Sequence, residues 1–381
     1  MVRFLAIAAL GVACLIAQPL LACSLCGSMN YSRATLRDDA ATARLVVYGT
    51  LANPKIGADG RGTTDIQIET VLKSDPLLGD RKVLTLQRYV PVDPKSPPKF
   101  MVFCDVINGE IDAFRGLPVK SPAFVEYLKQ AAKLPADRVK QLLFYFKYLD
   151  DADAEISTDA FIEFAKTNDA DVARVARQLD AGRLRKLLSD PATPPERLSL
   201  FAYLLGASGG PADAQFLANL LGDPAERLRP AFGGILAGLI QLDPKSGWAR
   251  TQSILRDPNR PFGERHATLG ALRFFHGAHA NDAKAEIIQG LGAALAHGDL
   301  ADLAIEDLRR WQWWDLTPDV LAVYTRPTHS APIMKRAIIR YALSCPRPEA
   351  KEFVANIRAA DAALVQDVEE GLQFEKPVTG K

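Results

Sequence analysis

Two cysteines near the N-terminus, Cys23 and Cys26, are the residues whose types and spacing most suggest chemistry. A Cys-x-x-Cys pair acts as a thioredoxin-type dithiol when its first cysteine begins a helix that follows a β-strand, but no strand pattern precedes Cys23. A haem attachment site needs histidine where this chain has Gly27. A zinc site needs two more ligands, and His276 and His279 lie far along the chain. We therefore predict a structural or lipid-attachment role for the pair, and no catalytic, cofactor-binding or metal-binding residue.

The segment from Trp311 to Trp314 holds three of the four tryptophans of the chain. On a helix, the side chains of Trp311 and Trp314 share a face and Trp313 points elsewhere. Two interpretations stay open, packing between helices and an aromatic patch that binds a partner. Trp311, Trp313 and Trp314 are therefore the candidate partner-binding residues.

Residues 1–22 have the pattern of a secretory signal peptide. Arg3 forms the charged region, an apolar run extends from Phe4 to Ala17, and Pro19 ends that run before it is long enough to span a membrane. Cys23 then becomes the first mature residue. The preceding Leu-Leu-Ala also fits a bacterial lipobox, so a lipid-anchored protein of the cell envelope and a soluble periplasmic protein both stay open. We expect membrane contact only through the signal or this lipid anchor.

The composition and net charge argue against a nucleic-acid-binding protein. The chain has 381 residues, of which 46 are Lys or Arg and 45 are Asp or Glu, giving a net charge of +1. Nucleic-acid-binding domains carry a basic excess that displaces phosphate counterions, so we expect no nucleic-acid partner. The length leaves room for about two folded units.

Two cysteines lie beyond the N-terminal pair, Cys104 and Cys345. Cys104 falls in a predicted strand, and an exported protein folds in an oxidising compartment. We therefore predict a disulfide from the N-terminal cysteines to this strand, with Cys26–Cys104 as the preferred pairing. Cys345 lies at the end of a predicted helix, and we predict that it is a small, buried, apolar residue.

The first half of the mature chain has a short helix and then strands. Residues 23–43 form a cysteine-containing segment with a helix between Ser32 and Ala43. Residues 44–118 alternate polar and apolar residues, interrupted by turn signals and by the prolines between 91 and 98. This pattern predicts a five-stranded antiparallel β-module.

Residues 119–375 have helical periodicity and a recurring phrase. Leu-x-Asp-Pro, followed by Glu-Arg, places Asp190, Asp223 and Asp257 at spacings of 33 and 34 residues. We expect each aspartate to cap the helix that follows it, with proline in the first turn. The spacing equals one helical hairpin, and this half resembles HEAT-repeat proteins, which implies an α-solenoid. Residues 376–381 read as a disordered tail.

The β-module resembles the netrin-like modules that include tissue inhibitors of metalloproteinases. The resemblance rests on the cysteine-rich start and the strands ending at Leu51, Lys73, Tyr89 and Cys104. It implies an OB-type barrel, and an N-terminal Cys23 whose amine and carbonyl bind the zinc of a target protease. The inhibitors have Cys-x-Cys, however, and acylation of Cys23 would remove its amine.

The complete plan is similar to that of exported bacterial proteins, planctomycete ones among them, with Ala-Cys-x-x-Cys, a small β-module and HEAT-like helices. That resemblance brings no catalytic residue with it. The expected fold is α+β and multidomain, a small OB-like β-barrel followed by an α-solenoid. We predict a non-catalytic scaffold that binds a protein partner through its helical repeats. The alternatives are a netrin-like metalloprotease inhibitor acting through Cys23 and a thiol-disulfide enzyme using Cys23 and Cys26.

Overall fold

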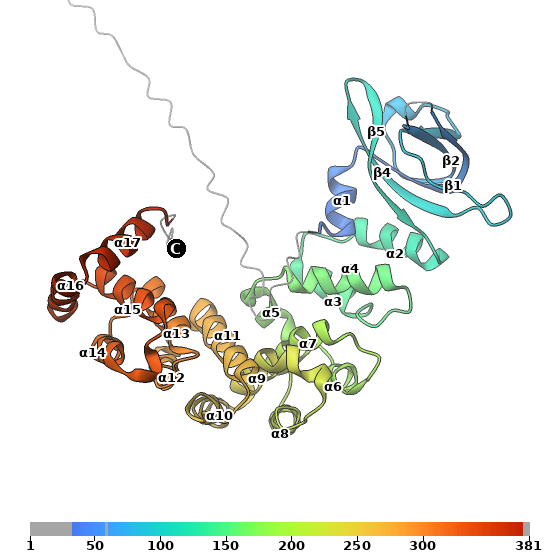
Figure 1. Ribbon diagram of the computed structural model, residues 1–381. Coiled ribbons are helices and arrows are strands. Elements are labelled where there is room, and N and C mark those ends of the chain that lie inside the picture. The colour runs from blue at the N-terminus through green and yellow to red at the C-terminus, as the bar shows by residue number, and fades with distance from the viewer. Residues whose placement is uncertain (1–32, 58–59, 376–381) are drawn as a thin grey trace, which may run out of the picture.

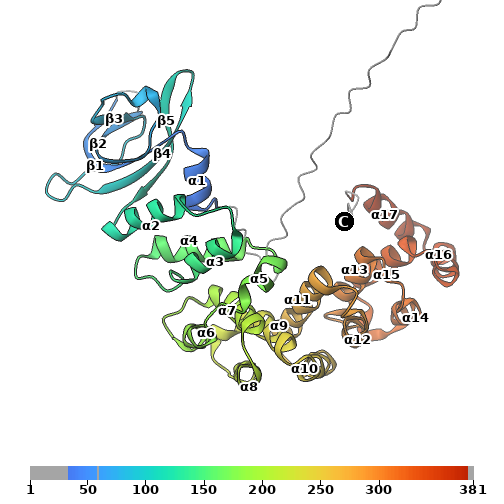
Figure 2. The ribbon, with the colours of Figure 1, turned by 180° about the vertical axis from the view of Figure 1, so that it is seen from behind.

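The computed structural model of the protein describes residues 33–57 and 60–375. These residues form a mixed α+β structure with seventeen α-helices and one five-stranded antiparallel sheet. The predicted signal peptide, Cys23, Cys26 and the predicted tail lie outside the described residues. Figure 1 shows the sheet at one end of a crescent of helices, and the view from behind in Figure 2 shows the same curvature.

The sheet has the strand order β3-β2-β1-β4-β5, and all neighbours are antiparallel. The short 3₁₀ helix η2 (Pro76–Leu78) connects β2 to β3. The five strands are β1 (Leu45–Ile56), β2 (Gly62–Lys73), β3 (Val83–Leu86), β4 (Lys99–Ile107) and β5 (Glu110–Pro118). The prediction of five antiparallel strands is confirmed.

The predicted closure into a barrel is wrong, because among the described residues β3 and β5 do not pair and the sheet is open. β3 has only four residues. The chain then enters the segment that contains Pro91, Pro94 and Pro97, whose nitrogens have no hydrogen to donate to a ladder. β3 is therefore too short to bridge the sheet to β5.

Alternation along β1 and β4 gives the middle of the sheet two buried faces. Leu45, Val47 and Cys104 belong to a small core enclosed by the curved sheet. Val46 and Phe103 point the other way and join the larger core of the helices. The sheet is therefore packed directly against the helical part of the molecule.

Helix α1 covers one edge of this junction, and four further helices follow the sheet. α1 starts with a capping box, in which Thr35 accepts a hydrogen bond from the backbone of Asp38 and the Asp38 side chain accepts one from Thr35. It confirms the short helix predicted here. The five helices are α1 (Leu36–Thr42), α2 (Pro122–Ala132), α3 (Arg138–Phe146), α4 (Ala154–Ala165) and α5 (Asp169–Ala176).

The remaining helices form two curved rows, which we call the helical array. The inner row lies on the concave side of the crescent and the outer row on its convex side (Figures 1 and 2). The inner row is α7 (Pro195–Ser208), α9 (Phe232–Leu242), α11 (Phe262–His279), α13 (Ala301–Trp311), α15 (Pro332–Ser344) and α17 (Ala362–Gln373). The outer row is α6 (Ala181–Ser189), α8 (Pro211–Leu220), α10 (Pro244–Arg256), α12 (Lys284–Ala294), α14 (Thr317–Ala322) and α16 (Pro348–Ala360). Within the described residues, no helix is long and apolar enough to cross a membrane.

Helices α7 and α9 pack closely because of glycine. Most residues of both helices are buried. A Cβ on Gly234 would lie 2.6 Å from the Cα of Ser199, and one on Gly238 would collide with the carbonyl oxygen of Ala202. The absence of side chains on α9 therefore lets its backbone approach α7.

The three repeated aspartates are equivalent, but they do not cap helices as we predicted. Each accepts a hydrogen bond from the backbone N–H two residues further on, at Ala192, Ala225 and Asn259, over 2.8, 2.9 and 2.9 Å. Helices α7 and α11 begin later, after Pro194 and Pro261. Since the hydrogen bond closes within the loop, Asp190, Asp223 and Asp257 fold turns between the two rows of helices.

The arginines of the same phrase connect neighbouring helical pairs. Arg197 donates to the Leu149 carbonyl (3.3 Å) and to the Thr158 hydroxyl (2.9 Å), and Arg227 donates to the Leu188 carbonyl (2.7 Å). Both reach back towards the N-terminus of the chain. Arg265 reaches forward instead, and forms two hydrogen bonds of 3.0 and 2.6 Å to Asp299. The repeat therefore encodes contacts between successive units.

Candidate functional site

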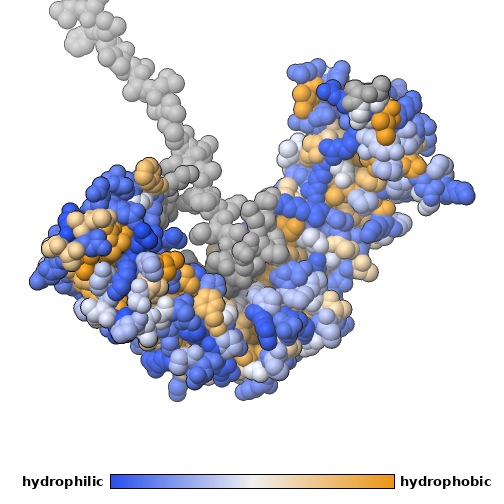
Figure 3. All heavy atoms as spheres, viewed as in Figure 1, coloured by the Kyte–Doolittle hydropathy of each residue, from blue (hydrophilic) through white to orange (hydrophobic). Residues whose placement is uncertain are grey.

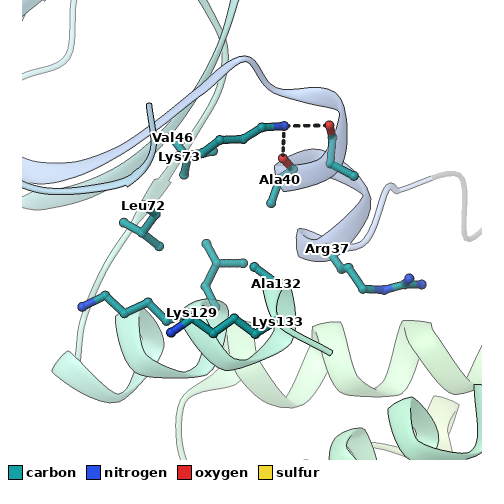
Figure 4. Close-up of a pocket in the computed structure, with 10 residues that line it drawn as sticks. Arg37, Ala40, Val46, Leu72, Lys73, Lys129, Ala132 and Lys133 are labelled. Atoms are coloured by element: carbon teal, nitrogen blue, oxygen red, sulfur yellow. Dashed lines mark hydrogen bonds between the residues drawn. The ribbon is translucent and has the colours of Figure 1, made fainter. Parts of the chain in front are cut away.

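A pocket of about 420 Å³ opens where α1, the sheet and α2 meet (Figure 4). Its volume lies within the range of roughly 300–1,000 Å³ that is typical of small-molecule sites. Val46 of β1, Leu72 of β2 and Leu128 of α2 give it an apolar surface. The other residues that line it are Arg37, Ala40, Ala41, Lys73, Lys129, Ala132 and Lys133.

The charged side chains of this pocket are all cationic, since four of its lining residues are basic and none is acidic. Lys73 extends towards the end of α1, where its ammonium group donates to the carbonyls of Ala40 (3.0 Å) and Ala41 (2.9 Å). The last carbonyls of a helix attract a cation. They are uncharged, however, so the positive charge of Lys73 is not neutralised by them.

Arg37 points away from the pocket (Figure 4) and binds the buried carboxylate of Glu163 on α4 over 3.1 and 3.3 Å. Arg138 on α3 binds the same carboxylate over 2.7 Å. Two guanidinium groups therefore share one carboxylate, and this group of three residues keeps a positive charge.

Lys129 lies in the last turn of α2 and Lys133 is its C-cap residue, and their side chains run beside the pocket (Figure 4). Neither has an ion-pair or hydrogen-bond partner among residues 33–57 and 60–375. Like charges at this spacing destabilise a helix slightly, although the nearby C-terminus of α2 favours cations. Two free ammonium groups therefore stand beside an apolar surface.

The wall formed by α1 is held in place by a buried carboxylate. Asp159 of α4 is only 4% exposed. It accepts a hydrogen bond from the backbone N–H of Leu36 and one from the hydroxyl of Tyr127, each 2.7 Å long. Burial raises the pKa of Asp159 to about 6, against the opposing effect of these two hydrogen bonds. Asp159 therefore fixes the start of α1 relative to α2 and α4.

Cys104, the predicted disulfide partner, is a free thiol among the described residues. Cys26 lies outside these residues, so the Cys26–Cys104 bridge stays a prediction. The Cys104 side chain is fully buried in the small core of the sheet, beside Leu45 and Val102. Burial, and then the charge of Asp112, raises the pKa of this thiol to about 12. The position of Cys104 in a predicted strand did not indicate that its side chain faces the small core of the sheet. Cys345 is also a buried free thiol, as predicted for a small apolar residue.

The tryptophan cluster is arranged differently from our prediction. Trp311 ends α13, and Gln312 has a left-handed backbone with φ of 57°, which breaks the helical spacing. Trp311 and Trp313 pack edge to face at 5.3 Å, while Trp314 turns away to pack on Tyr341. Trp311 and Trp313 therefore share a side, and all three tryptophans are partly buried against the helical core.

His276 belongs to this cluster, whereas His279 contacts a different aromatic residue. The His276 ring stacks on Trp311 with centroids 3.9 Å apart, and burial lowers the pKa of its imidazole. His279 lies against Phe275. In the part of the chain that the structure describes, no group of three or more His, Cys, Asp or Glu side chains could hold a metal ion.

Ion pairs join the inner-row helices from α11 to α17, each helix to the next. Their shortest N–O distances are all 2.8 Å. The pairs are Arg273–Asp307 between α11 and α13, Arg340–Glu306 between α15 and α13, and Arg336–Asp367 between α15 and α17. Figure 3 shows a mainly hydrophilic surface with small hydrophobic patches over the array. The inner row is therefore cross-linked by charge as well as by its apolar core.

The pocket was missed at the sequence level. Its only local signal is the pair Lys129 and Lys133 without an acidic residue four positions before either, where helices commonly place one. The pocket itself exists because α1, β2 and α2 meet, and these are distant in the sequence.

Comparison with known proteins assigns this chain to no family. No protein-family model matches the chain. No curated protein matches it either. Among solved structures, human deoxyhypusine hydroxylase in complex with glycerol superimposes with a TM-score of 0.27 at 17% identity, covering 67% of this chain and 91% of that chain. A superposition at this TM-score supports no statement about the fold or activity of this protein.

Proposed function

We propose that the protein is an exported, non-catalytic binding protein whose helical array is a HEAT-like solenoid that receives a protein partner. Solenoids of stacked helical pairs form curved surfaces that suit this task. Two rows of helices on one curve support the assignment. The equivalent turns at Asp190, Asp223 and Asp257 support it as well.

The observation that carries this proposal is the series of contacts between successive units. Arg197 and Arg227 join units in the first part of the array, and Arg265 and Arg273 do so further along. A surface held rigid in this way loses little conformational entropy when a partner binds. The inner row is therefore suited to recognition without rearrangement.

The alternative function, a netrin-like metalloprotease inhibitor, has one feature in its favour. The strand order β3-β2-β1-β4-β5 is that of a five-stranded OB barrel with its seam between β3 and β5 left open. This function depends on a free amine at Cys23. The third candidate, a thiol-disulfide enzyme, depends on reactive thiols at Cys23 and Cys26.

The intact mass of the mature protein from the envelope fraction separates these candidates. It reports cleavage after residue 22, a lipid on Cys23 and the oxidation state of the cysteines. An acyl chain on the Cys23 amine would exclude the inhibitor, because an amide nitrogen cannot bind the zinc of a protease as a free amine does. A free Cys23 amine, with nanomolar inhibition of a zinc protease that N-terminal acetylation abolishes, would contradict our proposal and support the inhibitor.

Charge reversal tests the array itself. Arg310→Glu changes an exposed residue of the inner row, and Lys245→Glu changes one of the outer row. Neither side chain has an ion-pair partner among the described residues. We expect the first variant to lose a partner that co-purifies with the wild-type protein and the second to retain it. Retention by both, or loss by both, would count against recognition by the inner row.

A further inference from the structure

We propose that the pocket between α1, the sheet and α2 binds an anionic amphiphile, a small molecule with an alkyl or aryl body and a single carboxylate head. This binding site is separate from the partner surface assigned to the helical array. Each part of the ligand has a counterpart in the pocket.

The apolar body of the ligand would lie on Val46, Leu72 and Leu128, with the alanines of α1 and α2 on either side. Ala132 is exposed in this structure and Leu72 is partly exposed, so an apolar ligand would remove their surface from water. The volume of about 420 Å³ accepts a molecule of moderate size and excludes a folded peptide element.

The charge of the ligand follows from the charges of the side chains that line the pocket. Lys73 binds only neutral carbonyls, and Arg37 shares the carboxylate of Glu163 with Arg138. Lys129 and Lys133 are the two cations of the pocket without any partner among the described residues. With no carboxylate in the lining, a cationic ligand would be repelled and an anionic head would pair with the lysines of α2.

The pocket is also pre-formed. Asp159 holds the first residue of α1, and the Lys73 ammonium holds its last carbonyls. Both ends of the helical wall are thereby fixed without the ligand. Binding then requires the ordering of only the two lysine side chains, which keeps its entropic cost low.

Isothermal titration calorimetry of the full mature chain tests this proposal with decanoate as the probe. Acetate supplies the head alone, and decyltrimethylammonium supplies the body with the opposite charge. We expect saturable one-site binding of decanoate that weakens as salt is added, and no saturable binding of the other two.

Two kinds of variant locate the site. Lys129→Ala with Lys133→Ala should weaken decanoate binding by about tenfold or more, whereas Lys120→Ala with Lys140→Ala removes the same charge outside the pocket and should change it by less than about twofold. Ala132→Trp fills the pocket while keeping its charges and should abolish binding. Circular dichroism melts confirm folding, and the two pairs of lysine variants decide the question if Ala132→Trp does not fold. Absence of saturable decanoate binding, equal binding of decyltrimethylammonium, or equal losses in both lysine pairs would overturn the proposal.

Discussion

Asp159 shows how one buried carboxyl controls local geometry. It joins the start of α1 to Tyr127 of α2, and it does so at the cost of being removed from water. The charge of the nearby Glu163 adds to the raised pKa that burial produces. Its protonated form is therefore favoured in the folded protein more than in the unfolded chain.

The pH dependence of Asp159→Asn measures this effect. Because the folded pKa of about 6 lies above the ordinary value of 3.8, the folded state binds the proton more tightly, and stability from this group is lost as pH rises through 6. Lowering the pH from 7 to 5 should stabilise the wild type by about 1 kcal/mol relative to Asp159→Asn. Urea unfolding of both proteins at the two pH values gives this difference, and a change of opposite sign would show that hydrogen bonding outweighs burial.

Cys104 provides a second prediction for a single residue. Its thiol is buried and its pKa is raised to about 12, so it should not react with Ellman's reagent in the native protein at pH 8. It should react after unfolding in urea. Peptide mapping assigns the modified cysteine, with Cys345 as a second buried thiol for comparison. Rapid native labelling of Cys104 would contradict the buried environment.

At the scale of elements, close contact between α7 and α9 depends on missing side chains. Gly234→Ala would place a Cβ 2.6 Å from the Ser199 backbone and should destabilise the protein by about 1–3 kcal/mol. Gly270→Ala is the matched control, because a Cβ there meets nothing within 4 Å and alanine favours a helix by about 0.5–1 kcal/mol. Thermal unfolding should therefore shift in opposite directions. Similar shifts in both variants would mean that α9 does not pack this closely.

The repeated turns allow a comparison between equivalent residues. Asp190→Ala, Asp223→Ala and Asp257→Ala each remove one loop hydrogen bond, and we expect similar losses of about 0.5–1 kcal/mol. Asp180→Ala removes a true cap that accepts two backbone hydrogen bonds at the start of α6, so its loss should be about 1 kcal/mol or more. Urea unfolding measures all four. Strongly unequal losses among the three repeated positions would argue against structural equivalence.

Much of the element structure could be predicted, because strand alternation and helical periodicity are local properties of the chain. The predictions were wrong where the local backbone conformation or the length of a strand determines the structure. The aspartates bond within their loops, Gln312 breaks the helix within the tryptophan cluster, and β3 is too short to close the sheet. The pocket beside Lys129 could not be predicted, since it needs three separate segments to meet.

We expect the two proposed binding surfaces to act independently, because they lie in different parts of the molecule. The pocket lies beside the sheet, at one end of the crescent, and the array extends from there to the C-terminal helices (Figures 1 and 4). Variants of Lys129 and Lys133 should therefore leave partner binding unchanged, as a co-purification assay with the wild type alongside would show. Loss of both activities in these variants would indicate that the surfaces are coupled.

Site-specific photo-crosslinking in the native envelope shows directly which row of helices contacts the partner. A photoreactive residue would replace exposed side chains of the inner row, at His266 and Arg310, and of the outer row, at Lys245 and Ser253. We expect mass spectrometry to find one common protein attached to both inner-row positions and absent from both outer-row positions. Equal labelling of the two rows, or attachment only at the outer row, would contradict recognition by the concave side of the array.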